Sequence, residues 1–429
     1  MVLLMIVVFF ILLFANIPVA FAIGISSAVY FMVSPELPNI LAMQRLATGT
    51  QSFPLLAVPF FVLVGHILNT SGITARLIKF SNLLTGHLVG GLAHVSIVLS
   101  TFMGGISGSA TADAAMQSRI LTTDMVKRGY SRGFSIGVIG ISSLITSTIP
   151  PSIGLILYGF ISGVSISKLF IAGIIPGVLM CLTLMITVYF VSKKRGYDQD
   201  ISLQKPSFQE IVKSFKESIW ALLFPVILLV GIRFGIFSAT EGGAVAVVYA
   251  LIVGKFIYKE LSWSNLKTAL NNAISDTGMI MLIIAAASMF GYVIAYENLP
   301  RSASEFITGI TDHPTLLLLI ILIFVFMAGL FMEATANTLL LTPIFLPIIT
   351  QAGIDPVHFG LIMIVLITLG GMTPPLGVTM FAVCSITKTS VLEFTKGAAP
   401  FLIAVLILII MLALFPQIVL FLPDLLMMN

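Results

Sequence analysis

The chain contains the stretch Ser109-Ala110-Thr111-Ala112-Asp113, and its second half contains the related stretch Glu333-Ala334-Thr335-Ala336-Asn337. Both belong to a longer repeat, because residues 105–176 align without a gap onto residues 329–400. The positions that match are mostly small, polar or helix-breaking. Irregular backbone is costly inside a membrane unless it lines a cavity within the protein. Paired interruptions in two halves of a membrane chain therefore predict the binding site of a transporter.

The composition is that of a polytopic membrane protein. Of the 429 residues, 58% are hydrophobic and only 9% are charged, whereas a soluble protein carries roughly 25% charged residues. The basic residues lie in short loops between apolar segments, so the net charge of +4 does not indicate nucleic-acid binding. The two cysteines, Cys181 and Cys384, also lie in apolar segments. We interpret them as buried hydrophobic residues and not as a disulfide.

The apolar segments predict about ten membrane crossings, since a spanning helix needs about 20 apolar residues. We expect them near residues 2–14, 17–34, 53–69, 132–162, 168–192, 219–236, 242–258, 276–297, 358–386 and 398–421. Two further segments, 88–122 and 313–350, are too long for one crossing and have a polar kink in the middle. Each is predicted to be a re-entrant hairpin. Pro150-Pro151 and Pro374-Pro375 should break two of the crossings, because proline removes a backbone donor.

These segments predict an all-α fold of two inverted repeats. Each half contains three crossings, a hairpin, a broken crossing and a final crossing, and an odd number of crossings turns the second half over. With both termini outside, only Arg45, Lys168, Arg233 and Arg301 of the 21 basic residues lie outside, as the positive-inside rule requires. The segments at about 205–219 and 259–272 are predicted to be amphipathic helices at the membrane surface.

The same reading divides the chain into five parts. Residues 1–87 are predicted to be scaffold spans of the first repeat, and residues 88–176 its hairpin and broken helix, which form a transport core. Residues 177–312 are predicted to contain a connecting amphipathic helix and the scaffold spans of the second repeat. Residues 313–400 are predicted to be the second half of the core, and residues 401–429 the final span.

The four interruptions are predicted to meet near the middle of the membrane. They supply hydroxyl and free carbonyl oxygens, which suit hard cations, and helix C-termini attract cations whereas N-termini attract anions. The ligands predicted for two or more Na⁺ ions are Ser107, Gly108, Ser109, Ser147, Thr148, Pro150, Ala334, Thr335, Gly370, Gly371 and Thr373. The residues predicted to bind an anionic solute are Ser107, Ser109, Thr111, Asp113, Glu333, Thr335, Asn337, Pro150 and Pro374.

Less specific explanations compete with these assignments. Glycines such as Gly105 and Gly108 also allow helices simply to pack closely. Acids inside a membrane are candidates for function, but Asp113 and Glu333 can also cap a helix or make a buried hydrogen bond. Because Asp113 aligns with Asn337, the position suits hydrogen bonding or ion coordination better than an obligatory proton relay.

Other classes of function fit less well. An intramembrane serine protease is an alternative because Gly105-Ile106-Ser107-Gly108 matches a short Gly-x-Ser-Gly pattern. However, His94 lies about 20 Å away along the same helix, and we expect no enzymatic activity. An ion channel is the other alternative, although two inverted halves favour alternating access. An ATP-driven pump would need a phosphate-binding Gly-x-x-x-x-Gly-Lys-Ser/Thr string, which does not occur.

Several motifs together resemble the large membrane subunit of TRAP transporters, the tripartite ATP-independent periplasmic transporters. They are Ser107-Gly-Ser-Ala-Thr-Ala-Asp113, Thr148-Ile-Pro-Pro-Ser152, Lys168-Leu-Phe-Ile-Ala-Gly-Ile-Ile-Pro-Gly177, Leu341-Thr-Pro-Ile-Phe-Leu-Pro347, Gly353-Ile-Asp-Pro-Val-His-Phe-Gly360 and Thr373-Pro-Pro-Leu-Gly377. The resemblance covers essentially the whole chain. One departure is Glu333, because many members carry aspartate there.

The resemblance implies a Na⁺-driven secondary transporter of the bacterial inner membrane that works as an elevator. It also implies two partners: a small four-helix membrane subunit, expected here as a separate chain, and a soluble periplasmic binding protein that delivers the solute. The family's Na⁺ sites map onto the hairpin tips and the broken-helix loops. The expected solute is a small carboxylate, such as a C4-dicarboxylate, a sugar acid or sialic acid, and general resemblance favours sialic acid.

Overall fold

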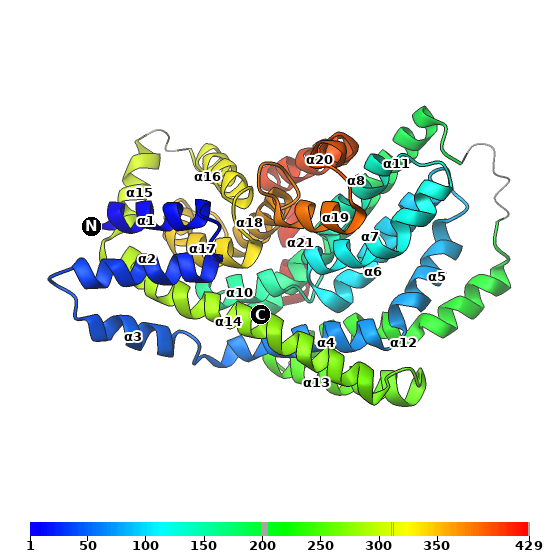
Figure 1. Cartoon of the computed structure of the whole chain (residues 1–429), viewed down its shortest axis with the longest axis horizontal. Helices are drawn as coiled ribbons and strands as arrows, with labels where there is room; N and C mark the ends of the chain where they lie inside the picture. The colour runs from blue at the N-terminus through cyan, green and yellow to red at the C-terminus, as the bar shows by residue number, and fades with distance from the viewer. Residues whose placement is uncertain (199–204, 310, 312, 428–429) are drawn as a thin grey trace.

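The protein folds as a bundle of helices elongated in one direction (Figure 1). The computed structural model describes residues 1–198, 205–309, 311 and 313–427, and every regular element in these ranges is a helix. Seven helices there are long and apolar enough to cross a membrane. A bent pair, Arg132–Thr148 with Ile153–Ser162, turns by 43° and makes the number up to eight. Shorter apolar helices of 10–17 residues accompany them, so the chain is a multi-pass membrane protein.

The first half runs from the N-terminus to a long helix that ends in three basic residues. Its elements are α1 (Val2–Phe14), α2 (Val19–Val33), α3 (Asn39–Thr48), η1 (Phe53–Leu56), α4 (Ala57–Thr70), α5 (Ile73–Thr85), α6 (Gly91–Ser107), α7 (Ala110–Lys127), α8 (Arg132–Ser142), α9 (Leu144–Thr148), α10 (Ile153–Ser162) and α11 (Ile166–Arg195). We call α6 with α7 hairpin 1, and α8 to α10 the first broken helix.

The second half repeats the order of hairpin, broken helix and long helix. Its elements are α12 (Phe208–Arg233), α13 (Ala239–Ile252), the π-helical turn η2 (Val253–Ile257), α14 (Trp263–Tyr296), α15 (Leu299–Thr308), α16 (Pro314–Gly329), α17 (Ala334–Gln351), α18 (Pro356–Gly370), α19 (Val378–Thr387), α20 (Val391–Leu414) and α21 (Pro416–Met427). We call α16 with α17 hairpin 2, and α18 with α19 the second broken helix. Both hairpins and both breaks lie where the repeat predicted them.

Three predicted boundaries are wrong. The amphipathic segment at 205–219 is not separate from the crossing after it, because α12 continues through both. Residues 263–272 of the segment at 259–272 likewise belong to α14, which begins at Trp263. A change from polar to apolar sequence does not end a helix, because its backbone hydrogen bonds continue. The crossing predicted at 398–421 is instead divided at Phe415, whose φ of −119° and ψ of 76° are not helical. Pro416 follows it, and proline disfavours helix at the preceding residue.

Side-chain caps fix where the helices around the interruptions begin. Ser109 accepts a hydrogen bond from the Ala112 amide at the start of α7. Ser152 does the same for the Leu155 amide at the start of α10. Such caps satisfy amides that have no partner within the helix. The hairpin tips and breaks are therefore defined ends of helices.

Contacts between elements place two groups of helices side by side. The helices α2, α4, α13 and α14 pack together, since α14 contacts α2 and α4, and α13 contacts α4, and we call this group the scaffold. In Figure 1, α4 and α13 lie along the lower side of the molecule. In the other group, α8 packs on α20, α7 on α19, and α10 on α17. Helices α8 and α20 approach very closely, as the distance between Gly397 and Gly133 shows. A Cβ atom at Gly397 would lie only 1.8 Å from the carbonyl oxygen of Gly133. All three pairs join the two halves of the chain.

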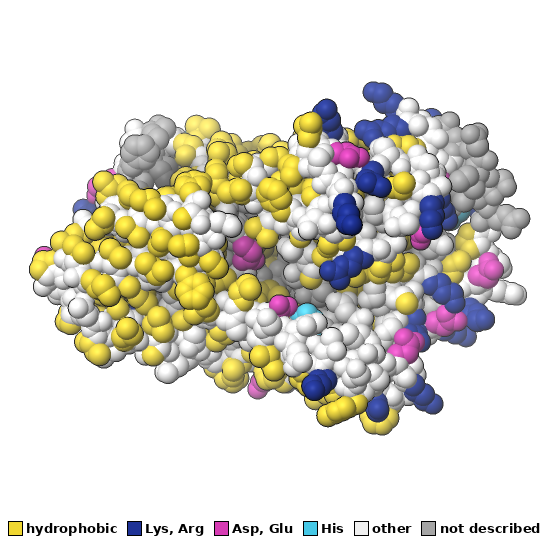
Figure 2. Space-filling view, in the orientation of Figure 1, with side chains coloured by type: hydrophobic (Ala, Val, Ile, Leu, Met, Phe, Trp, Pro, Cys, Tyr) yellow, Lys and Arg dark blue, Asp and Glu magenta, His cyan; other side chains and the backbone are white. Residues whose placement is uncertain are grey.

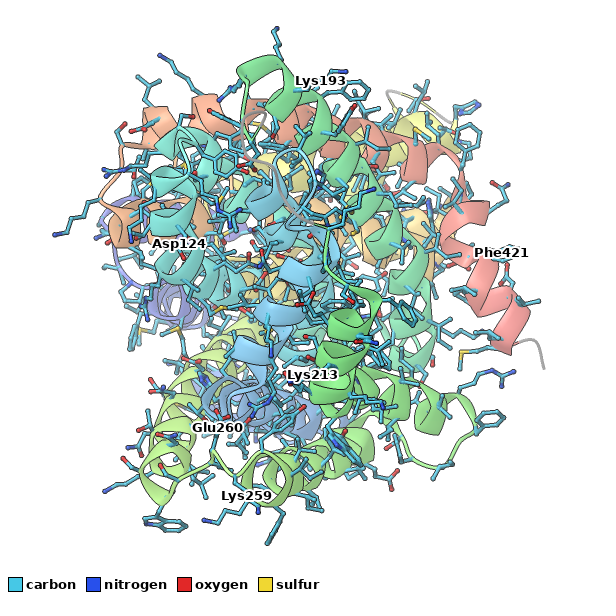
Figure 3. All side chains as sticks on the ribbon, turned by 90° about the vertical axis from the view of Figure 1, so that its right-hand side faces the viewer. Asp124, Lys193, Lys213, Lys259, Glu260 and Phe421 are labelled. Carbon is cyan, nitrogen blue, oxygen red and sulfur yellow. The ribbon has the colours of Figure 1, made fainter. Side chains whose placement is uncertain are left out.

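The surface is divided between apolar and basic regions. Figure 2 shows hydrophobic side chains over much of the end that carries α1 and α2, where Leu3 is 73% and Phe14 65% exposed. Lysine and arginine side chains gather on the opposite half of this face. Figure 3, viewed from that side of the molecule, labels Lys193, Lys213 and Lys259 there. The apolar part suits contact with lipid, and the basic end suits the aqueous boundary.

Candidate ion and solute site

Hairpin 1 closes against the break in the first broken helix. Gly108 ends α6 with a φ of 61°, a left-handed conformation that favours glycine. A Cβ atom there would lie 2.3 Å from the carbonyl oxygen of Pro151 and 3.3 Å from Cα of Ser152. A Cβ atom at Gly104, one turn earlier, would lie 2.8 Å from Cβ of Ile149. The tip of hairpin 1 and the loop with Pro150-Pro151 are therefore in direct backbone contact.

Hairpin 2 meets the second broken helix in the same way. A Cβ atom at Gly329, the last residue of α16, would lie 2.7 Å from the carbonyl oxygen of Ile367 and 3.2 Å from Cα of Gly370. A Cβ atom at Gly370 would in turn lie 2.5 Å from the carbonyl carbon of Gly329. The ends of α16 and α18 therefore touch.

The two halves meet beside these contacts. The hydroxyl oxygens of Thr111, at the start of α7, and Thr379, at the start of α19, lie 2.7 Å apart. A Cβ atom at Gly154, at the start of α10, would lie 2.9 Å from Cγ2 of Ile364 in α18. The structure thus brings the four interruptions into one cluster. The sequence analysis missed Thr379, because its partner in the repeat, Leu155, is apolar and leaves no repeated polar signal.

Removing either hydroxyl of the Thr111–Thr379 pair is expected to weaken the same contact between the halves. Thr111→Val and Thr379→Val should each lower the free energy of unfolding by about 1 kcal/mol. The double variant should cost little more than one single change, because both remove one hydrogen bond. Thermal unfolding of the four proteins measures this coupling, and strictly additive losses would contradict a shared hydrogen bond.

Helix ends of like polarity converge in the cluster. Gly104 and Ile149 bring the C-terminal end of α6 against that of α9, and Gly329 with Gly370 joins the C-terminal ends of α16 and α18. The N-terminal ends of α7 and α19 meet at the Thr111–Thr379 contact. Helix C-termini carry a partial negative charge and N-termini a partial positive charge. The arrangement offers two places for a cation and one for an anion.

Asp113 lies inside hairpin 1 and is only 1% exposed. Its carboxylate accepts hydrogen bonds from Ser100 Oγ of α6 at 2.7 Å, from Thr146 Oγ1 of α9 at 2.8 Å and from Gln117 Nε2 at 3.0 Å. These bonds tie both arms of hairpin 1 to the first broken helix. Asp113 therefore positions the site in this structure, and its carboxylate oxygens already have protein partners. The sequence analysis did not find the three donors, because serine, threonine and glutamine are common.

Asn337, the repeat partner of Asp113, has the opposite hydrogen-bonding role. Its Nδ2 donates to the carbonyl oxygens of Met332 at 2.9 Å and Ala328 at 3.2 Å, near the end of α16. Its Oδ1 is buried and has no hydrogen-bond partner among the described residues. Asn337 thus closes hairpin 2 and leaves one acceptor available to a ligand.

Glu333 and Thr335 form the start of α17. The Glu333 carboxylate accepts from the Thr335 amide at 2.8 Å and from Thr335 Oγ1 at 2.9 Å. Ala334 is the first residue of the helix. The helix cap considered in the sequence analysis is therefore what Glu333 provides here.

The remaining predicted ligands differ in the oxygens they can offer. Ser147 and Thr148 donate their hydroxyl hydrogens to the carbonyl oxygen of Leu144 at 2.9 Å, and Thr373 donates to that of Leu369 at 2.7 Å. Each hydroxyl oxygen keeps lone pairs that can coordinate a cation. By contrast, the carbonyl oxygen of Gly371 already accepts hydrogen bonds from the backbone amides of Thr379 and Met380.

The other predicted site residues lie at the same breaks. The hydroxyl of Ser107, at the tip of hairpin 1, faces the Ser109 amide at 3.5 Å. Pro150 and Pro374 each form a cis peptide bond with the proline that follows. Within the described residues, no hydrogen bond joins Ser107 to a histidine, and no cluster of His, Cys, Asp and Glu has the composition of a metal site.

A polar pair on the scaffold lies next to hairpin 1. A Cβ atom at Gly65 of α4 would lie 3.5 Å from Cα of Ser107. The next residue, His66, contacts Asp276 of α14 at 2.8 Å. The sequence analysis singled out neither His66 nor Asp276. A possible signal was its position directly before the apolar part of α14.

The match to a family model decides the class of protein. The model described as the DctM component of the tripartite ATP-independent periplasmic transporter matches residues 6–418. The chain belongs to this family. The resemblance seen in the sequence motifs is confirmed, and the relatives are named as transporter permeases and not as enzymes.

Individual relatives match along nearly the whole chain. The sialic acid TRAP transporter large permease protein SiaM of Vibrio cholerae is 38% identical over 414 residues, which cover 96% of each chain. The 2,3-diketo-L-gulonate TRAP transporter large permease protein YiaN of Escherichia coli is 35% identical and covers 94% of each chain. The crystal structure of the Alcanivorax borkumensis YdaH transporter has a TM-score of 0.62 at 14% identity and covers 90% of each chain. This last likeness concerns the fold alone.

Proposed function

We propose that the protein imports a small organic anion together with Na⁺. One observation carries the proposal: helix C-termini converge within each half of the chain, and helix N-termini meet between the halves. This polarity favours a cation in each half and a carboxylate between them. The family membership gives the transporter class, and the ion and the solute are inferred from the chemistry of the site.

The first cation site lies between the ends of α6 and α9. Its proposed ligands are oxygens of Ser107, Gly108, Ser109, Ser147 and Thr148, with the carbonyl group of Pro150 beside them. They are hydroxyl and carbonyl oxygens, a ligand set that suits a hard cation. Asp113 acts behind this site by holding hairpin 1 and the first broken helix together.

The second cation site lies between the ends of α16 and α18. The hydroxyl of Thr373 and carbonyl oxygens of this region are proposed as ligands, together with Thr335. The buried and unpartnered Oδ1 of Asn337 supports a cation here, because a buried acceptor without a partner costs free energy. Gly371 contributes least, since its carbonyl oxygen is already hydrogen-bonded twice.

The carboxylate of the solute is placed between the halves. Thr111 and Thr379 line the meeting point of α7 and α19, and Ser109 and Pro374 lie at the adjoining breaks. Backbone amides at helix N-termini bind carboxylates well. A bound Na⁺ and a bound carboxylate neutralise each other in a low-dielectric site, so their binding should be cooperative.

The proposed movement is that of an elevator. Residues 88–176 and 313–400 form the moving core, since their hairpins and broken helices are joined by backbone contacts and by the α7–α19 and α10–α17 packing. The contact of Gly65 with Ser107 would be one that changes when the core slides. In this scheme the scaffold stays fixed in the bilayer.

The proposed setting is a bacterial inner membrane with both termini in the periplasm. The basic end of the molecule then faces the cytoplasm, as the positive-inside rule requires. A small membrane subunit and a periplasmic binding protein complete the transporter. For the solute, one relative is named for sialic acid and another for 2,3-diketo-L-gulonate. We propose a sugar acid and favour sialic acid.

The proposal is tested by uptake into proteoliposomes that contain the chain and its small subunit. Binding proteins loaded with sialic acid, 2,3-diketo-L-gulonate or a C4-dicarboxylate are added outside, with an inward Na⁺ or K⁺ gradient. We expect uptake of one sugar acid that requires both its binding protein and Na⁺. Uptake that is equally fast in K⁺ would reject Na⁺ coupling.

Removing a hydroxyl ligand should weaken Na⁺ binding without unfolding the protein. Ser109→Ala and Thr373→Ala are each expected to raise the Na⁺ concentration for half-maximal uptake by about tenfold, the effect of losing roughly 1.4 kcal/mol of binding energy. Thr350→Ala is the control, because this hydroxyl is exposed and bonds only within its own helix. An unchanged Na⁺ dependence in both site variants would reject the ligand assignment.

A further inference from the structure

A pocket lies between α5 and hairpin 1, away from the ion and solute site. Its volume is about 390 Å³, and it is open to the surface. One wall is apolar and is formed by Ile78 of α5, Leu92 and Val95 of α6, and Ile120 and Leu121 of α7. Such a wall in a membrane protein suits a hydrocarbon chain.

The rim of the same pocket is polar and carries both signs of charge. It is formed by Asn82 of α5 and by Asp124, Lys127 and Arg128 at the end of α7. The nearest approach between the acid and a base is 4.0 Å, from Asp124 Oδ1 to Lys127 Nζ. These two side chains are 64% and 74% exposed, so both can bind a further partner.

The order of these residues along α7 sets the direction of the pocket. Ile120 and Lys127 are two turns apart, which is about 10 Å. The charged rim lies at the basic end of the molecule, where Figure 3 labels Asp124, and the apolar wall lies deeper. A headgroup at the rim and an acyl chain along the wall would match this order. In the proposed orientation this is the inner leaflet.

We propose that the pocket binds one molecule of phosphatidylethanolamine. Its phosphate would contact Lys127 and Arg128, its ammonium group would donate to Asp124, and one acyl chain would cover the apolar wall. Phosphatidylglycerol has no cation for Asp124. Phosphatidylcholine has a cation without N–H donors, so it cannot make the same charge-assisted hydrogen bonds.

The bound lipid would link a connecting helix to the transport core. Helix α5 joins α4 to hairpin 1. Gly72, with a φ of 75°, stands at the start of α5, and Gly90, with a φ of 79°, stands at the start of α6. Ion pairs of Arg76 with Glu260 and of Lys79 with Glu217 hold α5 to the turn before α14 and to α12. The lipid fills the space between α5 and hairpin 1 and so stabilises the present position of hairpin 1 against α5.

Lipid binding to the purified full chain tests the proposal without any transport assay. Native mass spectrometry in mild detergent compares phosphatidylethanolamine, phosphatidylcholine and phosphatidylglycerol with identical acyl chains. The native protein should bind phosphatidylethanolamine about tenfold more tightly than the other two, as expected for one charge-assisted hydrogen bond. Equal binding of the three lipids would overturn the proposal.

Three variants separate this pocket from general lipid contact. Asp124→Asn should remove the preference for phosphatidylethanolamine and leave phosphatidylglycerol binding unchanged or improved. Lys127→Gln with Arg128→Gln should weaken binding of all three lipids. Lys193→Gln with Lys194→Gln is the control, since this basic pair on α11 does not line the pocket. A control pair that weakens binding as much as the pocket pair would assign the effect to net charge and overturn the site.

Discussion

Gly108→Ala is expected to abolish Na⁺-dependent uptake and to lower the melting temperature clearly. Two costs add at this position. A left-handed conformation costs a residue with a Cβ atom about 1–2 kcal/mol. The new Cβ atom would also lie 2.3 Å from the carbonyl oxygen of Pro151, which is backbone and cannot rotate away. The tip of hairpin 1 must therefore separate from the first broken helix, and the proposed cation site opens.

The chain offers a matched control for this prediction. Gly163 ends α10 with a φ of 70°, but no atom of the part of the chain that the structure describes lies within 4 Å of a Cβ atom there. Gly163→Ala should show the conformational cost alone and keep most of the uptake. Melting temperature and Na⁺-dependent uptake are measured for both variants. Similar behaviour of the two would mean that the contact with Pro151 is not important for the site.

The arrangement of the breaks could be predicted because helix-breaking residues are visible in the sequence. Gly108 ends α6 in a left-handed conformation, and the paired prolines at 150–151 and 374–375 break their helices, whereas the single prolines Pro176 and Pro400 lie inside continuous helices. The recurrence of the Pro-Pro pair in the two halves also indicated that the breaks belong together. Pro416 carried the same kind of signal for the division at Phe415, and the sequence analysis passed over it.

The partners of the site residues could not be predicted, because they depend on how helices distant in sequence pack. Thr379 meets Thr111 only because α19 lies on α7. Asp113 was a visible candidate, but its role follows from Thr146, which lies on α9 and not on hairpin 1. The continuity of α12 and α14 was missed for another reason, since hydropathy marks the edge of the membrane and not the end of a helix.

Exchanging the residues of the repeat pair, as Asp113→Asn or Asn337→Asp, is expected to destabilise the protein in both cases. The Asp113 carboxylate only accepts hydrogen bonds. An amide at this position would place its NH₂ group against the donating Nε2 of Gln117. Gln117 cannot simply turn over, because its Oε1 accepts from Ser96 and its Nε2 donates to Ser100. The loss should be about 1–3 kcal/mol, the cost of leaving a buried donor unpaired.

Asn337→Asp removes donors instead of an acceptor. The carbonyl oxygens of Met332 and Ala328 lose the hydrogen bonds from Nδ2, and a carboxylate is placed beside them. We expect a loss of at least about 2 kcal/mol, one unmade bond for each buried carbonyl. Since the two sites share no hydrogen-bond partner, the double variant should show the sum of both losses. A double variant as stable as the native protein would mean that the two positions are interchangeable.

Thermal unfolding in Na⁺ and in K⁺ then separates positioning from ion binding. Asp113→Asn should lower the melting temperature in both salts equally, because Asp113 has protein partners for its oxygens and acts through the packing of hairpin 1. Asn337→Asp should regain part of its loss in Na⁺ but not in K⁺, because a carboxylate oxygen replaces the free Oδ1 as a cation acceptor. A Na⁺-specific rescue of Asp113→Asn would instead make Asp113 a ligand. If Asn337→Asp showed no Na⁺-specific rescue, Asn337 would not belong to the second cation site.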